Sequence, residues 1–342
     1  MEDNAPLETE GPIEENNCVI CNIPSVIEGH PTRLCADCRR KLINYPIPLW
    51  VKLFGAATLV LMIISLISLP GNFGAALAIS RAIKAENHLN YVTEQRELES
   101  ARKVAPNSVD VLGHLMIASF NNMDIETVFS ASNDLSKKPI EDTALYNQLS
   151  YIIDESKLYI PSDSLYNITQ RYGNKTIPDT VYIKYLKKKP SDIYSLYVLA
   201  NSYYDKKQYL TADTLASKIL SIDNEYMPAI NLKSAVKREI MQTDSSIFYC
   251  DKILAINHES VYGTSSKART FLKAGKFKQG LILAQQCENL ANNDPYNIAT
   301  LALAYHYNKE YQKRDKLLQT AIKDTTLQVY MKYAKDQIAS HP

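Results

Sequence analysis

The sequence predicts an all-α protein, in which a solenoid of helical hairpins follows a small metal-binding segment and one apolar helix. Three observations lead to this prediction: a 34-residue period in the C-terminal half, four cysteines within residues 18–38, and an uncharged apolar run from Leu53 to Leu69. The composition agrees, because only 10 glycines stand beside 23 tyrosines and an aliphatic content that is ample for a large core or a repeat array.

The charge balance argues against a nucleic-acid partner. Lys and Arg total 38 and Asp and Glu total 37, so the chain lacks the basic excess that phosphate backbones attract. Residues 1–17 are acidic and contain no aromatic side chain, and we expect them to be disordered.

The cysteines of the N-terminal segment form a C-x2-C-x13-C-x2-C pattern, which is typical of four-thiolate zinc sites. The predicted ligands of a structural Zn²⁺ are Cys18, Cys21, Cys35 and Cys38. Four thiolates leave no coordination position open for catalysis. Reduced thiols on a flexible tail, or a redox pair, are the alternatives.

Residues 18–45 resemble the small zinc ribbons found at the ends of many bacterial proteins, in which a short basic helix follows the knuckle, here Arg39 to Leu42. The segment is too short to bury a core, so bound metal would supply most of its folding free energy.

The apolar run predicts a transmembrane helix over residues 49–73, with a buried core helix as the alternative. More basic residues precede the run than follow it. By the positive-inside rule, the N-terminus would be cytoplasmic, and the rest of the chain would lie outside a bacterial inner membrane, in the periplasm.

Five Asp-Ser/Thr-apolar triplets follow the run. They resemble the sequon for periplasmic O-glycosylation in some Gram-negative bacteria, and modified hydroxyls would lie on the surface. The candidate hydroxyls are those of Thr143, Ser164, Thr180, Thr214 and Thr325.

The repeat is clearest in the 34 residues from Ile193 to Tyr226, and its register continues in units that start at 193, 227, 261 and 295. Small residues at Ala200 and Ala212 allow the two helices of a unit to cross closely. The unit resembles the tetratricopeptide repeat (TPR) family over residues 190–328. We expect diverged hairpins over 74–189 and a capping helix over 329–342.

Some repeat positions depart from the family pattern. Lys233 and Lys267 stand where an apolar residue is expected, which puts the groove of those units in doubt. Cys250 and Cys287 occupy packing positions and are interpreted as small core residues, with a disulfide between them as the alternative.

The family resemblance implies protein binding rather than catalysis, and the sequence carries no hydrolase or transferase motif. The groove would suit a peptide or helix, and its tyrosines and arginines are residue types enriched at binding hot spots. The tyrosine stripe has inter-helix packing as its alternative interpretation. The predicted groove residues are Tyr194, Tyr197, Asn201, Tyr204, Arg238, Tyr262, Arg269, Tyr296, His306 and Tyr307.

The family's carboxylate clamp is not expected, because Tyr197, Ala235 and Tyr262 occupy its Lys and Asn places and only Asn201 matches. The leading hypothesis is a membrane-anchored scaffold of the bacterial envelope with a cytosolic zinc site. One alternative is a transmembrane signalling adaptor whose output is the zinc knuckle. Another is a membrane-tethered adaptor whose array faces the cytoplasm.

Overall fold

The structure is a computed structural model that describes residues 16–43, 47–136, 138–173, 175–291, 294–322 and 328–340. Within helices it does not describe the side chains of 66–72, 320–322, 328–330, 333 and 340. Most of the predicted disordered tail, residues 1–15, lies outside the described residues. The chain divides into two units, Met1–Pro70 and Gly71–Pro342.

The described residues are almost entirely helical, and an antiparallel bridge between Val26 and Cys35 is the only β pairing among them. The first eight α-helices are α1 Ala36–Ile43, α2 Leu49–Glu86, α3 Tyr91–Val104, α4 Val109–Asn121, α5 Ile125–Leu135, α6 Thr143–Ser156, α7 Asp163–Thr169 and α8 Asp179–Leu186. The remaining nine are α9 Ile193–Asp205, α10 Tyr209–Ile222, α11 Met227–Glu239, α12 Thr243–Ile256, α13 Val261–Lys273, α14 Phe277–Leu290, α15 Pro295–Tyr307, α16 Tyr311–Ile322 and α17 Gln328–Ser340.

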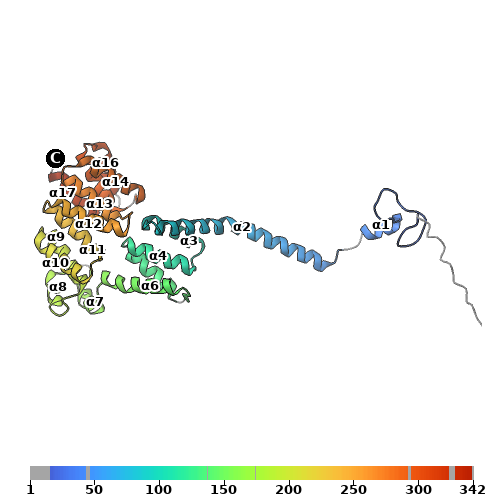
Figure 1. Cartoon of the computed structure of the whole chain (residues 1–342), viewed down its shortest axis with the longest axis horizontal. Coiled ribbons are helices and arrows are strands. Elements are labelled where there is room, and N and C mark those ends of the chain that lie inside the picture. Colours follow the sequence, from blue (N-terminus) through green and yellow to red (C-terminus); the bar gives the residue numbers. More distant parts are fainter. Residues whose placement is uncertain are drawn as a thin grey trace, which may run out of the picture. The chain divides into compact units, whose positions relative to one another are not determined.

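The helices α9 to α16 form stacked hairpins, and the helices α9, α11, α13 and α15 begin 34 residues apart (Figure 1). Each of these hairpins turns through one residue with positive φ, at Lys207, Met241, Gly275 and Lys309. At each turn a backbone N–H donates back to the last turn of the preceding helix, as Gln208 N does to Tyr203 O at 2.8 Å. This is the hydrogen-bond pattern of a Schellman C-cap, repeated at the same place in every unit.

The same turn joins α4 to α5, where Met123 has a φ of 61° and Asp124 N donates to Ser119 O at 2.8 Å. The predicted all-α, TPR-type solenoid is therefore confirmed as a fold class. The core between hairpins is built from small and medium side chains, among them Ala200, Ala212 and Ile219, all fully buried.

Cys250 and Cys287 confirm their predicted packing role, since both are buried free thiols. The Cys250 thiol lies 3.1 Å from Ser234 Oγ, and Cys287 Sγ lies 3.5 Å from Ser265 Oγ. The alternative disulfide between them is absent.

The N-terminal hairpins contact the loop between α12 and α13, which is far away in the sequence. Thr93 donates to Glu259 from its backbone N at 2.7 Å and from its hydroxyl at 2.8 Å. His258 N donates to Leu89 O at 2.9 Å, and Asn257 Nδ2 donates to Asn122 Oδ1 at 2.8 Å. These bonds fasten the start of the solenoid to its middle.

The predicted membrane location is wrong. No helix among the described residues combines the length and the hydropathy that a bilayer span requires. Helix α2 continues beyond the predicted span, and four of its alanines recur every three or four positions, which places them on one face of the helix. Ala75, Ala78, Ala82 and Ala85 are buried on that face, and Ala78 packs with Ala101 and Val111.

Outside this alanine face, Phe73, Leu77 and Ile83 are exposed apolar side chains, and Arg81 pairs with Glu97 of α3 at 2.7 Å. The C-terminal part of α2 is therefore a packing helix of the solenoid. The assignment of the cysteine segment to the cytoplasm and of the array to the periplasm falls with the predicted span.

Candidate functional site

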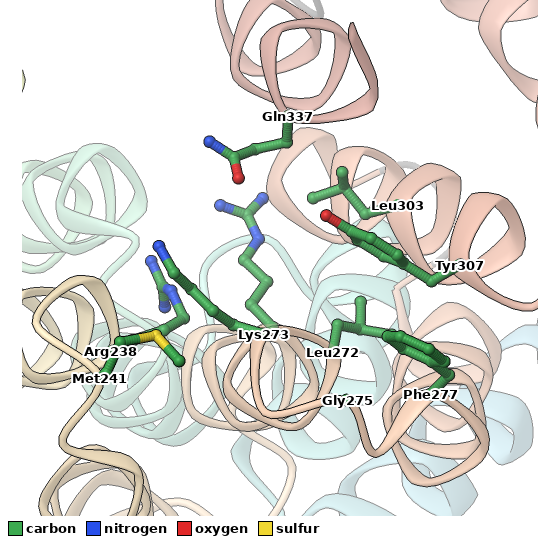
Figure 2. Close-up of a pocket in the computed structure, with 10 residues that line it drawn as sticks. Arg238, Met241, Leu272, Lys273, Gly275, Phe277, Leu303, Tyr307 and Gln337 are labelled. Atoms are coloured by element: carbon green, nitrogen blue, oxygen red, sulfur yellow. The ribbon is translucent and has the colours of Figure 1, made fainter. Parts of the chain in front are cut away.

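A pocket of about 240 Å³ opens between the first helices of the last three units. Two features define it: cationic side chains on one side and an apolar wall on the other (Figure 2). Its lining residues come from α11 and the turn after it, from α13, from the turn into α14 and the start of α14, and from α15 and α17. They are Arg238, Met241, Arg269, Leu272, Lys273, Gly275, Phe277, Leu303, Tyr307 and Gln337.

The cationic side consists of Arg238, Arg269 and Lys273. The first two are only 3% and 8% exposed. The carboxylate of Glu239 contacts this side: it pairs with Lys273 Nζ, and its Oε1 lies 3.3 Å from Arg238 Nε. Although burial raises the pKa of Glu239, Arg238 and Lys273 lower it below its ordinary value, so this carboxyl is ionised at neutral pH. Three cationic side chains therefore converge on this side of the pocket.

The guanidinium of Arg269 is held by neighbours on α15. Its Nε donates to Thr300 Oγ1 at 2.8 Å, and one Nη donates to Tyr296 O at 3.0 Å. The same group stacks over the Tyr296 ring, 3.8 Å from the centroid. Because these contacts fix its orientation, Arg269 contributes a charge whose position is set before any ligand binds.

The apolar wall includes an aromatic stack between two neighbouring units. Phe277 at the start of α14 stacks on Tyr307 at the end of α15, with ring centroids 5.3 Å apart and an interplanar angle of 5°. Gly275, with a φ of +76°, makes the tight turn that brings Phe277 back beside α13, the first helix of the same unit. Leu272, Leu303 and the Tyr307 ring face the same space as Lys273 in Figure 2.

Three of the predicted groove residues line this pocket: Arg238, Arg269 and Tyr307. Tyr204 is adjacent, because its hydroxyl accepts from Arg238 Nη2 at 3.3 Å. Tyr296 contacts Arg269 through its ring and its backbone carbonyl.

The other predicted groove residues lie elsewhere. Tyr194 packs against the buried cluster of Leu165, Tyr182 and Tyr185. Tyr197 packs against the Tyr226 ring at 5.8 Å, and Asn201 donates to a carbonyl of its own helix. All three residues therefore make contacts within the solenoid.

Two further predicted residues also make internal contacts. The ring of Tyr262 lies 5.5 Å from that of Tyr296. His306 is buried, and its Nδ1 lies 2.9 Å from Arg314 Nη1.

Sequence reasoning missed Lys273, Phe277 and Gln337 as pocket residues. The sequence did contain a signal for Lys273. Lys273 and Glu239 occupy the same repeat position in successive units and carry opposite charges, and in the structure they form an ion pair. Gln337 reaches the pocket from α17, beyond the last repeat, where the period gives no guidance.

The cysteines of the N-terminal unit form a second candidate site. The four Sγ atoms, of Cys18, Cys21, Cys35 and Cys38, lie within 4.8 Å of one another. Cys21 Sγ and Cys35 Sγ are 3.5 Å apart, close to the separation of about 3.8 Å that tetrahedral zinc imposes with Zn–S bonds of about 2.3 Å. All four are free thiols rather than disulfides.

The backbone of the knuckle favours a thiolate. Hydrogen bonds from the backbone of Cys35 and Cys21 lower the pKa of Cys18 to about 6. Cys35 lies at the start of α1 beside the bridge to Val26, so a turn and a helix start hold the two Cys-x-x-Cys pairs face to face. The donor set and its spacing fit a structural zinc ion.

The four Asp-Ser/Thr triplets that the structure describes lie on helices or at a helix start. Asp142 caps α6, accepting from Ala144 N at 2.8 Å, which gives this Asp-Thr pair a structural role. The hydroxyl-bearing residues of the four described triplets are exposed, and Thr325 lies outside the described residues. Their glycosylation stays a prediction.

The comparisons with known proteins give no family assignment. No family model and no curated protein matches the sequence. Among solved structures, a tetratricopeptide repeat protein from Parabacteroides merdae is 12% identical with a TM-score of 0.41, over 78% of this chain and 85% of that one. Yeast Tom70 is 13% identical with a TM-score of 0.36, over 80% of this chain and 59% of that one.

An O-GlcNAc transferase mutant from Thermobaculum terrenum is 15% identical with a TM-score of 0.31, and the match spans 39% of this chain and 24% of the transferase. At these identities and TM-scores, no activity or partner of those proteins can be assigned to this chain. The assignment of a TPR-type solenoid therefore stands on the repeating hairpins and turns of the chain itself.

Proposed function

We propose that this protein is a non-enzymatic adaptor that binds a partner protein through the pocket formed by α11, α13 and α15. The preferred ligand would be an extended or helical segment that presents a carboxylate next to an aromatic or aliphatic side chain. The observation that carries this proposal is the convergence of Arg238, Arg269 and Lys273 opposite the Phe277–Tyr307 stack.

The chemistry follows from the two sides of the pocket. A carboxylate placed near three cations gains charge-assisted hydrogen bonds, and burial of the cations strengthens them relative to contacts at an open surface. The apolar wall rewards a side chain that leaves water. A cavity of about 240 Å³ accommodates one or two side chains, so the rest of a ligand would follow the surface outside it.

A binding experiment tests the proposal with defined probes. Fluorescein-labelled peptides that pair Asp or Glu with Phe or Leu are titrated with the full chain, beside charge-swapped peptides that carry Lys. The acidic peptides should bind more tightly, and their binding should weaken as salt is raised.

Two substitutions locate the site. Lys273→Ala should weaken binding of the acidic peptide about tenfold, equivalent to about 1.4 kcal/mol. Tyr307→Ala should weaken it more, as truncation of an aromatic hot spot does. Lys218→Ala removes an exposed lysine on α10 and serves as the matched control. Equal binding of acidic and charge-swapped peptides would refute the proposal, as would an equal effect of Lys218→Ala and Lys273→Ala.

We further propose that Cys18, Cys21, Cys35 and Cys38 hold a structural Zn²⁺ that organises the N-terminal unit. The spacing of the four sulfur atoms supports this proposal. Metal analysis of the purified chain should find zinc that Cys21→Ser reduces by one equivalent, whereas Cys250→Ser should leave it unchanged. A chain purified without zinc that binds none on titration would contradict the proposal.

A further inference from the structure

A second cluster of metal-ligating side chains lies where α2, α3 and α4 meet. Glu86 is the last residue of α2, Glu94 lies in the first turn of α3, and His114 lies on α4. One ligand atom from each residue lies within 4.8 Å of the other two. His114 Nδ1 lies 2.9 Å from Glu86 Oε2.

Glu94 is the unusual member of this cluster. It is fully buried, and neither of its carboxylate oxygens has a hydrogen-bond partner. An ionised carboxylate in that position is strongly destabilising unless a cation or hydrogen bonds compensate it. Tyr91 is buried on the same turn of α3, but no hydrogen bond joins it to Glu94 among the described contacts. The geometry leaves this carboxylate facing Glu86 and His114.

The surrounding charges add to the negative potential. The carboxylates of Asp110 and Asp142 add to the negative charge of Glu86 around His114. The Glu94 carboxylate is buried beside Glu86. Two species would relieve the burial of Glu94: a proton, or a cation shared with Glu86 and His114.

We propose that Glu86, Glu94 and His114 bind a divalent transition-metal ion that fastens the end of α2 to α3 and α4. Two carboxylates and one imidazole suit Zn²⁺ and related ions, whereas Ca²⁺ and Mg²⁺ prefer oxygen ligands alone. Ligand atoms arranged tetrahedrally around zinc at about 2.1 Å lie about 3.4 Å apart. This value lies between the 2.9 Å from His114 Nδ1 to Glu86 Oε2 and the 4.8 Å that bounds the cluster.

The site is accessible and charge-balanced. The side chains of His114 and Glu86 are 31% and 25% exposed, so an ion can enter from solvent. Two carboxylates and a neutral imidazole carry two negative charges, which one divalent cation neutralises. Three protein ligands leave room for water to complete the coordination. Since the three ligands lie on three different helices, bound metal would stabilise their packing.

The test uses the full chain and the metal alone. Zinc content is measured after dialysis against zinc and removal of the excess, and Zn²⁺ affinity is measured by competition with a chromogenic chelator. Glu94→Gln should remove one zinc equivalent. His114→Gln and Glu86→Gln alter partly exposed residues. Each should lower the Zn²⁺ affinity of this site at least tenfold, because the loss of a residue that only supports a ligand already costs about 10- to 100-fold.

Matched controls lie on the same helices. Glu99→Gln on α3 and His88→Gln just after α2 change exposed residues of the same types and should retain the zinc of the wild type. Substitution with Co²⁺ separates this site from the four-cysteine site, because only thiolates give a sulfur-to-cobalt charge-transfer band. Glu94→Gln should leave that band unchanged while it removes the second equivalent.

Thermal unfolding keeps the proposal testable if a variant folds poorly. Zinc should raise the melting temperature of the chain that carries Cys21→Ser, and this rise should be absent when His114→Gln is added. The proposal is overturned if Glu94→Gln and His114→Gln both keep the wild-type zinc content and affinity. Glu94 would then be a buried carboxylic acid that carries its own proton.

Discussion

The buried lysine Lys233 offers the sharpest test of how this solenoid tolerates departures from the repeat pattern. It stands where an apolar residue is expected, and it is 5% exposed on α11. Its Nζ lies 2.8 Å from Asp213 Oδ1 and donates to Ser217 Oγ at 2.8 Å, both on α10. It also lies 5.5 Å from the centroid of the Tyr249 ring on α12. One side chain therefore joins three consecutive helices.

Lys233→Met keeps a long apolar stem and removes the charge. Breaking a buried ion pair costs about 3–5 kcal/mol when the remaining charge is left without a partner. Here Asp213 retains Lys237 at 3.0 Å and its side chain is 21% exposed, so we expect a smaller loss of about 1–2 kcal/mol in the free energy of unfolding. Lys233→Ala should cost more, because it also leaves a cavity.

The assay is urea unfolding followed by circular dichroism, at neutral pH and at acid pH. A double-mutant cycle with Asp213→Asn should give a coupling energy of about 1–2 kcal/mol. Although burial raises the pKa of Asp213, hydrogen bonds with Lys233 and Lys237 lower it below its ordinary value. The pair's stabilisation is therefore complete above the unfolded pKa of about 4, and it is lost as the pH falls through the lower folded value.

The difference in stability between wild type and Lys233→Met should shrink over that acid range. If Lys233→Met is as stable as the wild type at pH 7 and the cycle shows no coupling, the lysine is only a tolerated substitution and the reasoning fails.

Three further predictions concern other parts of the solenoid. Glu259→Ala removes both hydrogen bonds from Thr93 and should lower the free energy of unfolding by about 2–3 kcal/mol, measured by urea unfolding; a change below about 0.5 kcal/mol would mean that the N-terminal hairpins are held elsewhere. Gly280→Ala places a Cβ 2.6 Å from Leu272 Cδ2 and should cost about 1–3 kcal/mol by overpacking, so an unchanged melting temperature would contradict the packing described here. Cys287 is fully buried, and burial raises its pKa to about 11, so iodoacetamide at pH 8 should modify it only after denaturation, as peptide mass spectrometry would detect.

The hairpins were predictable because each repeat must bury the same face against its neighbours. The same physical demand places Ala200 and Ala212 at a helix crossing, and it sets the starts of α9, α11, α13 and α15. A period carries no information about contacts outside it. The bonds of Thr93 with Glu259 join residues 166 positions apart, and no sequence pattern marks either of them.

The error over the apolar helix has a related cause. A window of apolar residues hides the period within it, and the buried alanines from Ala75 to Ala85 recur at helical spacing. Similarly, His114 has apolar neighbours in the sequence, which give no sign of a metal-ligand cluster. The carboxylates that face it come from other helices and become visible only in three dimensions.

The cationic pocket, by contrast, follows from the repeat once the ends of the first helices are considered together. Arg238 and Lys273 lie in the last turns of α11 and α13, where unpaired carbonyls and the helix dipole favour positive charge. Because successive first helices end at the same level of the solenoid, basic residues at their ends lie beside one another. Each cation is stabilised by its own helix, and together they produce a positive potential that a single helix would not provide. A TPR-type array can therefore acquire selectivity for acidic ligands by substitutions near the ends of its first helices, without any change in its packing.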